Sequence, residues 1–175
     1  MAKYIQAAVI IILALTSFSR NSFWRDDGSL WQDAIRKAPN KARGYNELGL
    51  HYIHVKDYPA ALQALNRSIQ INRYEVAVYI NLGLTYEGLN QTDKAIEAYE
   101  LAIFMKPDEP TPYYNLGHLY YNTLKDREKA FQYFLKARDL NPLEPDVHQY
   151  LGVIYREKGD HAAAEKEFQL HRMLK

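Results

Sequence analysis

The sequence predicts an all-α protein, a solenoid of four helix pairs that follow a separate N-terminal segment. The first observation behind this prediction is a recurring motif, Tyr-x-x-Leu-Gly-x-x-Tyr, which appears as YNELGLHY at Tyr45 and as YINLGLTY at Tyr79. It returns as YYNLGHLY at Tyr113 and as HQYLGVIY at His148, so that its glycines lie 34, 34 and 35 residues apart. The second observation is that a segment with small and large apolar residues at helical spacing follows each copy.

The second helix of each predicted pair carries small and large residues where it would face its partner. In the second copy these are Ala95, Tyr99 and Ala102, and Pro107 follows them. The motif glycine and the alanines keep large side chains out of the contact between two helices, while the aromatic ring fills the space between layers. Proline then ends the second helix and starts the turn into the next pair.

These residues resemble the tetratricopeptide repeat (TPR) family over residues 42–175, with repeats at 42–75, 76–109, 110–144 and 145–175. The resemblance implies a right-handed α-α superhelix whose concave groove is lined by the first helix of each pair. The first repeat departs from the pattern, with Arg73 where the next two have Pro107 and Pro142. The third repeat has one extra residue between its helices, and we expect it to lengthen the loop there.

The resemblance places a partner-binding groove on the first helices, with an apolar and aromatic floor and few charges. Such a groove suits an extended or helical peptide, or a protein segment, with apolar side chains. The charged last helix indicates either a polar cap or the point where a longer array was interrupted, and self-association through this helix is a further alternative. The predicted groove residues are Asn46, Leu50, Ile53, Ile80, Asn81, Leu84, Glu87, Tyr114, Asn115, His118, Tyr121, Gln149, Val153 and Arg156.

Residues 1–20 form an apolar segment that stands apart from the repeats. No charged residue lies between Lys3 and Arg20. These sixteen residues would span about 24 Å as a helix, less than the roughly 30 Å of a bilayer's hydrocarbon core. We interpret residues 4–19 as a membrane anchor, or as a secretory signal that is cleaved after Ser19 to release an exported protein. A buried core helix is the third alternative.

Residues 21–41 join this segment to the repeats and contain SLWQDAIRKAPN, residues 29–40. Because Trp31, Ala34 and Pro39 align with the aromatic residue, alanine and proline of the later second helices, we predict a capping half-repeat. Residues 20–49 also resemble the junction between the last membrane helix and the TPR array of transmembrane, O-mannosyltransferase-like proteins. That resemblance implies a TPR domain on the non-cytoplasmic, periplasmic or lumenal side.

Composition and motifs weigh against several classes of function. The net charge of +1 gives no dense basic face for nucleic acid, and the absence of cysteine excludes disulfides and thiolate metal sites. No zinc-protease pattern, phosphate-binding loop or nucleophile–base pair is recognisable, so we expect no enzyme activity, metal or cofactor. The sequence predicts a non-catalytic scaffold for protein interactions, membrane-tethered or exported. The alternative is an accessory module that presents acceptor proteins in a membrane glycosyltransferase system of the O-mannosyltransferase type.

Overall fold

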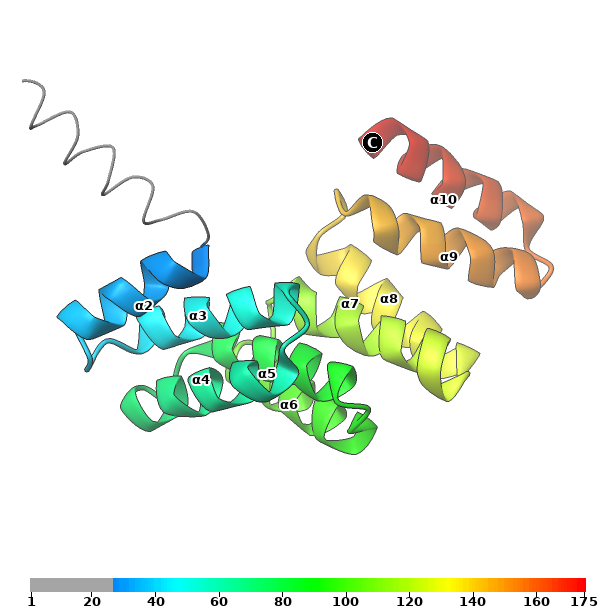
Figure 1. The fold of residues 1–175 in the computed structure, drawn as a ribbon. Helices are drawn as coiled ribbons and strands as arrows, with labels where there is room; N and C mark the ends of the chain where they lie inside the picture. The colour runs from blue at the N-terminus through cyan, green and yellow to red at the C-terminus, as the bar shows by residue number, and fades with distance from the viewer. Residues whose placement is uncertain (1–26) are drawn as a thin grey trace, which may run out of the picture. The chain divides into compact units, whose positions relative to one another are not determined.

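The computed structural model describes residues 27–175, and every regular element in that range is helical (Figure 1). The predicted all-α class is therefore confirmed for this range. The chain divides into two compact units, the first ending at Arg73 and the second beginning at Tyr74. The apolar helix predicted for residues 1–20 lies outside the described residues. Within residues 27–175, no helix has the length and apolar character needed to cross a membrane.

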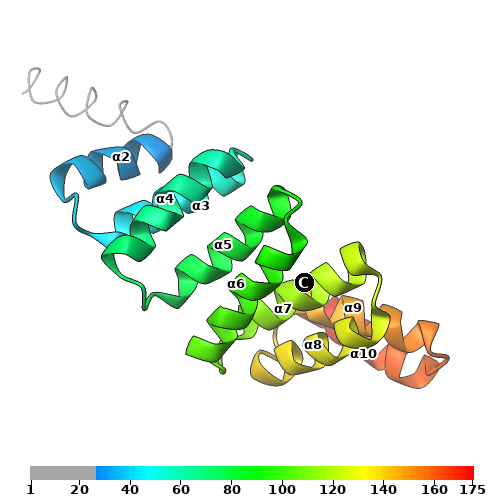
Figure 2. The ribbon, with the colours of Figure 1, turned by 90° about the horizontal axis from the view of Figure 1, so that it is seen from below.

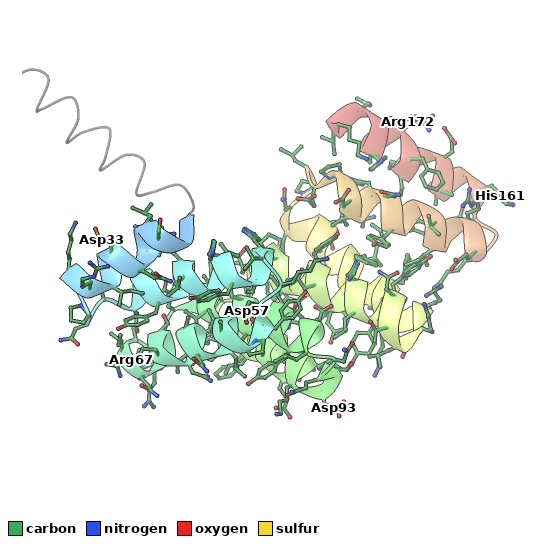
Figure 3. All side chains as sticks on the ribbon, viewed as in Figure 1. Asp33, Asp57, Arg67, Asp93, His161 and Arg172 are labelled. Carbon is green, nitrogen blue, oxygen red and sulfur yellow. The ribbon has the colours of Figure 1, made fainter. Side chains whose placement is uncertain are left out.

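The first unit contains helix α2 (Asp27–Lys37) followed by the pair α3 (Ala42–His54) and α4 (Tyr58–Ile71). Helix α2 packs on α3, where Ile35 lies so close that a Cβ atom on Gly44 would come within 3.1 Å of it. Asp57 precedes α4, and its carboxylate accepts a hydrogen bond of 3.1 Å from the Ala60 N–H (Figure 3). The segment predicted as a half-repeat is thus a helix that covers one side of the first motif helix.

The second unit contains three helix pairs in succession (Figure 2). In each pair the first helix carries the motif and the second helix packs against it. The pairs are α5 (Val76–Gly88) with α6 (Thr92–Met105), α7 (Pro110–Leu119) and its π-helical turn η1 (Tyr120–Leu124) with α8 (Arg127–Leu140), and α9 (Pro145–Glu157) with α10 (His161–Leu174).

The motif glycine allows the two helices of a pair to approach closely. A Cβ atom on Gly83 would lie 2.2 Å from Cε1 of Tyr99, whose side chain is fully buried. Gly117 and Phe134 make the equivalent contact, at 2.8 Å, in the next pair. No side chain at these two positions would fit without moving the ring beneath it. The contact inferred from the sequence is therefore present, and its second partner is a large residue rather than an alanine.

The extra residue of the third repeat is accommodated within the first helix, not in the loop. The turn after each motif helix has a residue with positive φ, and this residue is Asn90 after α5 and Lys125 after η1. Lys125 lies one residue further from its motif glycine, Gly117, than Asn90 does from Gly83. The added residue widens the last turn into a π-helix over Tyr120–Leu124. The expected longer loop was wrong because a π-turn absorbs one residue while keeping the backbone hydrogen-bonded.

His148 replaces the tyrosine that begins the other copies of the motif, and its side chain is buried. Its Nε2 lies 2.9 Å from the Pro142 carbonyl oxygen. In the preceding pair the Tyr113 hydroxyl donates to the Pro107 carbonyl at 3.0 Å, so the imidazole reproduces the hydrogen bond of the tyrosine.

The other ring nitrogen of His148 connects α9 to α10. Nδ1 lies 2.6 Å from one oxygen of Glu167, and Arg138 Nη1 donates to the second oxygen at 3.1 Å. The Glu167 residue is only 5% exposed. Since a carbonyl oxygen can only accept, Nε2 carries a hydrogen. The last helix is thus held by a polar network in which His148 and Glu167 are buried and Arg138 is half-buried.

We predict that Glu167→Ala lowers the free energy of unfolding by about 3 kcal/mol, because it leaves His148 and Arg138 without their buried partner. Urea denaturation monitored by circular dichroism measures the change. Glu165→Ala is the control: its carboxylate lies on the same helix but pairs with Arg172 at the surface, at 2.8 Å. We expect a much smaller loss for this variant. Similar losses for both variants would contradict the role of the buried network.

Candidate functional site

Four aromatic side chains gather on one side of α7 and α9 in the second unit. Tyr114 and His118 lie on α7, Tyr121 on η1, and Tyr150 on α9. The Tyr150 ring centroid is 5.3 Å from that of Tyr121, 5.8 Å from His118 and 6.3 Å from Tyr114. Because all four residues are half-buried, the cluster keeps solvent-accessible surface, and we call it the tyrosine face.

The tyrosine face rests on the buried ring of Phe134 from α8. Tyr150 stacks on this ring with a centroid separation of 4.7 Å and an interplanar angle of 7°. Tyr114 contacts the same ring at 6.0 Å. Phe134 is also the ring that packs against Gly117, so one core residue supports both the helix pair and the face above it. Such packing holds the exposed rings in one arrangement.

A charged pair closes one edge of the tyrosine face. The Arg127 guanidinium lies over the Tyr121 ring, 3.7 Å from its centroid, and Arg127 Nε is 3.2 Å from Glu157 Oε2. The Tyr121 hydroxyl donates to the other oxygen of Glu157 at 3.3 Å. The two charges at this edge therefore neutralise each other and fix the Tyr121 ring between them.

A pocket of about 170 Å³ lies at the opposite edge, beside Tyr114. Two of its lining residues, Glu144 and Asp146, have neither a salt bridge nor a side-chain hydrogen bond within the described part of the chain, and we call it the acidic pocket. Burial, followed by the nearby Tyr150 and the carboxylates of Asp146 and Glu144, raises the pKa of Tyr114 to about 12. The full lining is Pro110, Thr111, Tyr114, Ala137, Asn141, Glu144, Asp146 and Val147.

The asparagines predicted for the groove are buried in the structure. Asn46, Asn81 and Asn115 are each less than 9% exposed. The Nδ2 atom of Asn115 is buried without a hydrogen-bond partner among residues 27–175. Their roles as contact residues stay predictions.

The remaining predicted residues lie in several different settings. Glu87 accepts a hydrogen bond of 2.5 Å from the Tyr99 hydroxyl and so serves the core of its own pair. Burial raises the pKa of Glu87, while the Tyr99 hydrogen bond and the charge of His118 act in the opposite direction. Arg156 is exposed and lies over the Phe168 ring at 5.5 Å. In the second unit Ile80, Leu84 and Val153 are half-buried and Gln149 is exposed, and in the first unit Leu50 and Ile53 are half-buried.

The central residue of the tyrosine face, Tyr150, was not among the predicted groove residues. Its position in the motif is held by Asn81 and Asn115 in the two preceding copies, so the repeat pattern predicts an amide there rather than an aromatic ring. The signal that could have found it is helical spacing, since Asp146, Tyr150 and Glu157 recur at intervals of four and seven residues on α9. Because Asp146 also lines the acidic pocket, the same spacing points to that pocket.

Histidine and carboxylate side chains do not combine into a metal site in residues 27–175, where no group of three or more of them could hold an ion. The small pocket of the first unit brings His51 and His54 near Glu47, together with Trp31 and Leu50. This arrangement does not form such a group.

Family models for the tetratricopeptide repeat match three parts of the chain, residues 28–76, 88–123 and 110–142. Together these matches cover more than half of the sequence. The chain is a tetratricopeptide repeat (TPR) protein. The first match begins within α2, so the similarity to the family includes the helix predicted as a half-repeat.

Curated relatives are similar to most of this chain at low sequence identity. The human protein O-mannosyl-transferase TMTC3 is 25% identical over 148 residues, which is 77% of this chain and 16% of that protein. Anaphase-promoting complex subunit 6 of Arabidopsis thaliana is 24% identical over 135 residues, which is 77% of this chain and 25% of that protein. The chain thus spans about a quarter or less of the length of these relatives.

Solved structures agree with the TPR fold. MamA from Desulfovibrio magneticus has a TM-score of 0.68 at 22% identity, covering 96% of this chain and 94% of that chain. PilF from Pseudomonas aeruginosa has a TM-score of 0.77 at 17% identity, covering 96% of this chain and 76% of that chain. At these identities the likeness shows a common architecture.

We predict that Asp146→Asn lowers the pKa of Tyr114 from about 12 towards its ordinary value of 10, because it removes one of the negative charges that favour the protonated phenol. Nuclear magnetic resonance (NMR) titration of the tyrosine ring carbons, with Tyr114→Phe to assign the signal, measures this shift. In the wild type the raised pKa stabilises the fold fully below about pH 10, and this contribution is lost as the pH rises through about 12.

Glu97→Gln is the control for this titration, because Glu97 is an exposed carboxylate on α6 that does not line the acidic pocket. It should leave the Tyr114 pKa unchanged. An equal effect of the two substitutions, or none from Asp146→Asn, would show that the pocket carboxylates do not act on Tyr114.

Proposed function

We propose that this TPR protein is a non-catalytic scaffold that binds a segment of a partner protein on the tyrosine face of α7 and α9. The observation that carries this proposal is the four half-buried aromatic side chains that meet around Tyr150. Clusters of this kind are typical of binding surfaces, because tyrosine offers a large apolar area together with a hydroxyl group.

The arrangement of the tyrosine face favours binding because its rings are already ordered. Phe134 supports Tyr150 from below, and the Arg127–Glu157 pair holds Tyr121 at one edge. These rings therefore lose little conformational entropy when a partner binds. The relatives named as anaphase-promoting complex subunits support a role in protein assembly for TPR arrays of this kind.

The proposal includes a membrane connection through residues 4–19, with the TPR part on the non-cytoplasmic side. The uncharged, largely apolar run between Lys3 and Arg20 supports it. Tethering would raise the effective concentration of the scaffold for partners at the same membrane. The intact mass of the membrane-fraction protein tests this: a retained Met1 is expected, whereas an N-terminus at Arg20 would favour export after signal cleavage.

A second candidate function is an accessory module that presents acceptor proteins to a membrane O-mannosyltransferase. The similarity to protein O-mannosyl-transferase TMTC3 over 148 residues favours it, together with the junction-like residues 20–49. In this case the segment bound on the tyrosine face is an acceptor of mannose. Identification of the captured partner separates the two functions, because the accessory role requires that partner to be mannosylated.

Photocrosslinking from the tyrosine face tests the scaffold function. We expect benzoylphenylalanine at Gln149, an exposed residue of α9 beside Tyr150, to capture a partner in cells that express the full chain. The same group at Glu97 on α6 should capture none of it. Tyr150→Ala should weaken the capture about tenfold, as for an interface hot spot, while circular dichroism verifies that this variant is folded.

Two outcomes would contradict the proposal. One is capture of the partner from Glu97 alone. The other is a folded Tyr150→Ala variant that captures the partner as well as the wild type does.

A further inference from the structure

We propose that the acidic pocket beside Tyr114 binds an arginine side chain of the partner. This inference rests on the proposed function, since it takes the bound segment to lie along the tyrosine face. It adds the chemical identity of one residue of that segment and the place where its guanidinium group lies, between Glu144 and Asp146.

The size and lining of the pocket suit one long side chain. Its volume of about 170 Å³ is well below the roughly 300 to 1,000 Å³ of pockets for drug-sized molecules. Pro110, Ala137 and Val147 line it with apolar groups, and the Tyr114 ring forms part of the wall. An apolar lining can pack against the methylene groups of an arginine stem while the charged end lies among polar atoms.

The charges around the pocket select a cation. Glu144 and Asp146 lack a salt bridge within residues 27–175, and neither lysine nor arginine occurs among the residues that line the pocket. Two nearby carboxylates of the second unit do have partners: Glu157 pairs with Arg127 at 3.2 Å, and Glu109 pairs with Lys106 at 2.9 Å. The acidic pocket is therefore left with two uncompensated negative charges, which attract a positively charged group of a partner.

Stabilisation of the start of α9 does not fully account for these two carboxylates. Asp146 lies in the first turn of α9, where a negative charge interacts favourably with the helix dipole. Glu144 is the N-cap residue of the same helix, but its side chain makes no capping hydrogen bond. Its carboxylate is thus available at the edge of the pocket, and α8 ends beside it at Leu140, where the carbonyl end of the helix adds negative potential.

Tyr114 favours arginine over lysine. A guanidinium is planar, is weakly hydrated and stacks on aromatic rings, and its fork of N–H groups can reach two carboxylates at once. The Tyr114 hydroxyl has no hydrogen-bond partner among the described residues. The phenol is neutral at physiological pH, so it can act as a hydrogen-bond donor or acceptor to a bound group.

Methyl NMR of the full chain tests this inference with small probes. Ala137 and Val147 line the pocket, so their methyl signals report on its occupation. We expect N-acetyl-arginine amide to shift them in a saturable way, and N-acetyl-citrulline amide, which has the same shape without the charge, to bind about 3- to 10-fold more weakly. N-acetyl-lysine amide should also bind more weakly than the arginine probe, and added salt should weaken the arginine probe most.

Variants of the pocket complete the test. Glu144→Gln and Asp146→Asn should each weaken the arginine probe about threefold, while Glu97→Gln on α6 leaves it unchanged. The inference is wrong if citrulline or lysine binds as well as arginine, or if Glu97→Gln has the effect of Asp146→Asn. Arginine selectivity without any capture from Gln149 would reject the scaffold function alone. Capture from Gln149 without arginine selectivity would reject the pocket assignment alone.

Discussion

The contact between a motif glycine and a large side chain of the partner helix is the constraint on which each repeat depends. A Cβ atom at Gly83 would lie 2.2 Å from the Tyr99 ring, and one at Gly117 would lie 2.8 Å from Phe134. With glycine in place, the ring can fill the space beneath the first helix, and both helices bury their apolar sides at native packing density. The recurrence of this contact explains why the motif has a nearly constant interval. In each pair the glycine of the first helix must lie opposite the large side chain of the second helix.

The same contact prepares the binding surface. Phe134 packs against Gly117 on one side and stacks under Tyr150 at 4.7 Å on the other. The core of the third pair therefore supports the tyrosine face directly, and no flexible loop has to order before a partner binds. The π-turn at Tyr120–Leu124 contributes by keeping Tyr121 on a hydrogen-bonded helix, where its ring lies 5.3 Å from Tyr150. An insertion that lengthened the loop would have left this ring without a helical support.

The two edges of the tyrosine face differ in net charge, and this difference favours one orientation of a bound partner segment. At one edge Arg127 and Glu157 pair with each other around Tyr121. At the other edge Glu144 and Asp146 lack such partners within the described residues. Apolar area contributes affinity on such a surface, while unpaired charge contributes orientation and selectivity. A partner segment with a basic residue at one end could place that residue at Glu144 and Asp146 and its apolar residues on the rings, in one orientation only.

The sequence by itself determined the repeat, the all-helical class and the glycine side of the contact between paired helices, because local spacing encodes which side of a helix is buried. It also indicated Tyr114, His118 and Tyr121, which lie within a few residues of the motif glycine Gly117 on the first helix of the third pair. It did not identify Tyr150, the buried state of Asn115 or the link from His148 to Glu167, since each depends on which residues of separate helices meet. Whether an extra residue forms a loop or a π-turn, and which carboxylates stay unpaired, is decided by packing between helices. These properties belong to the tertiary structure because they depend on distances between side chains that are far apart in the chain.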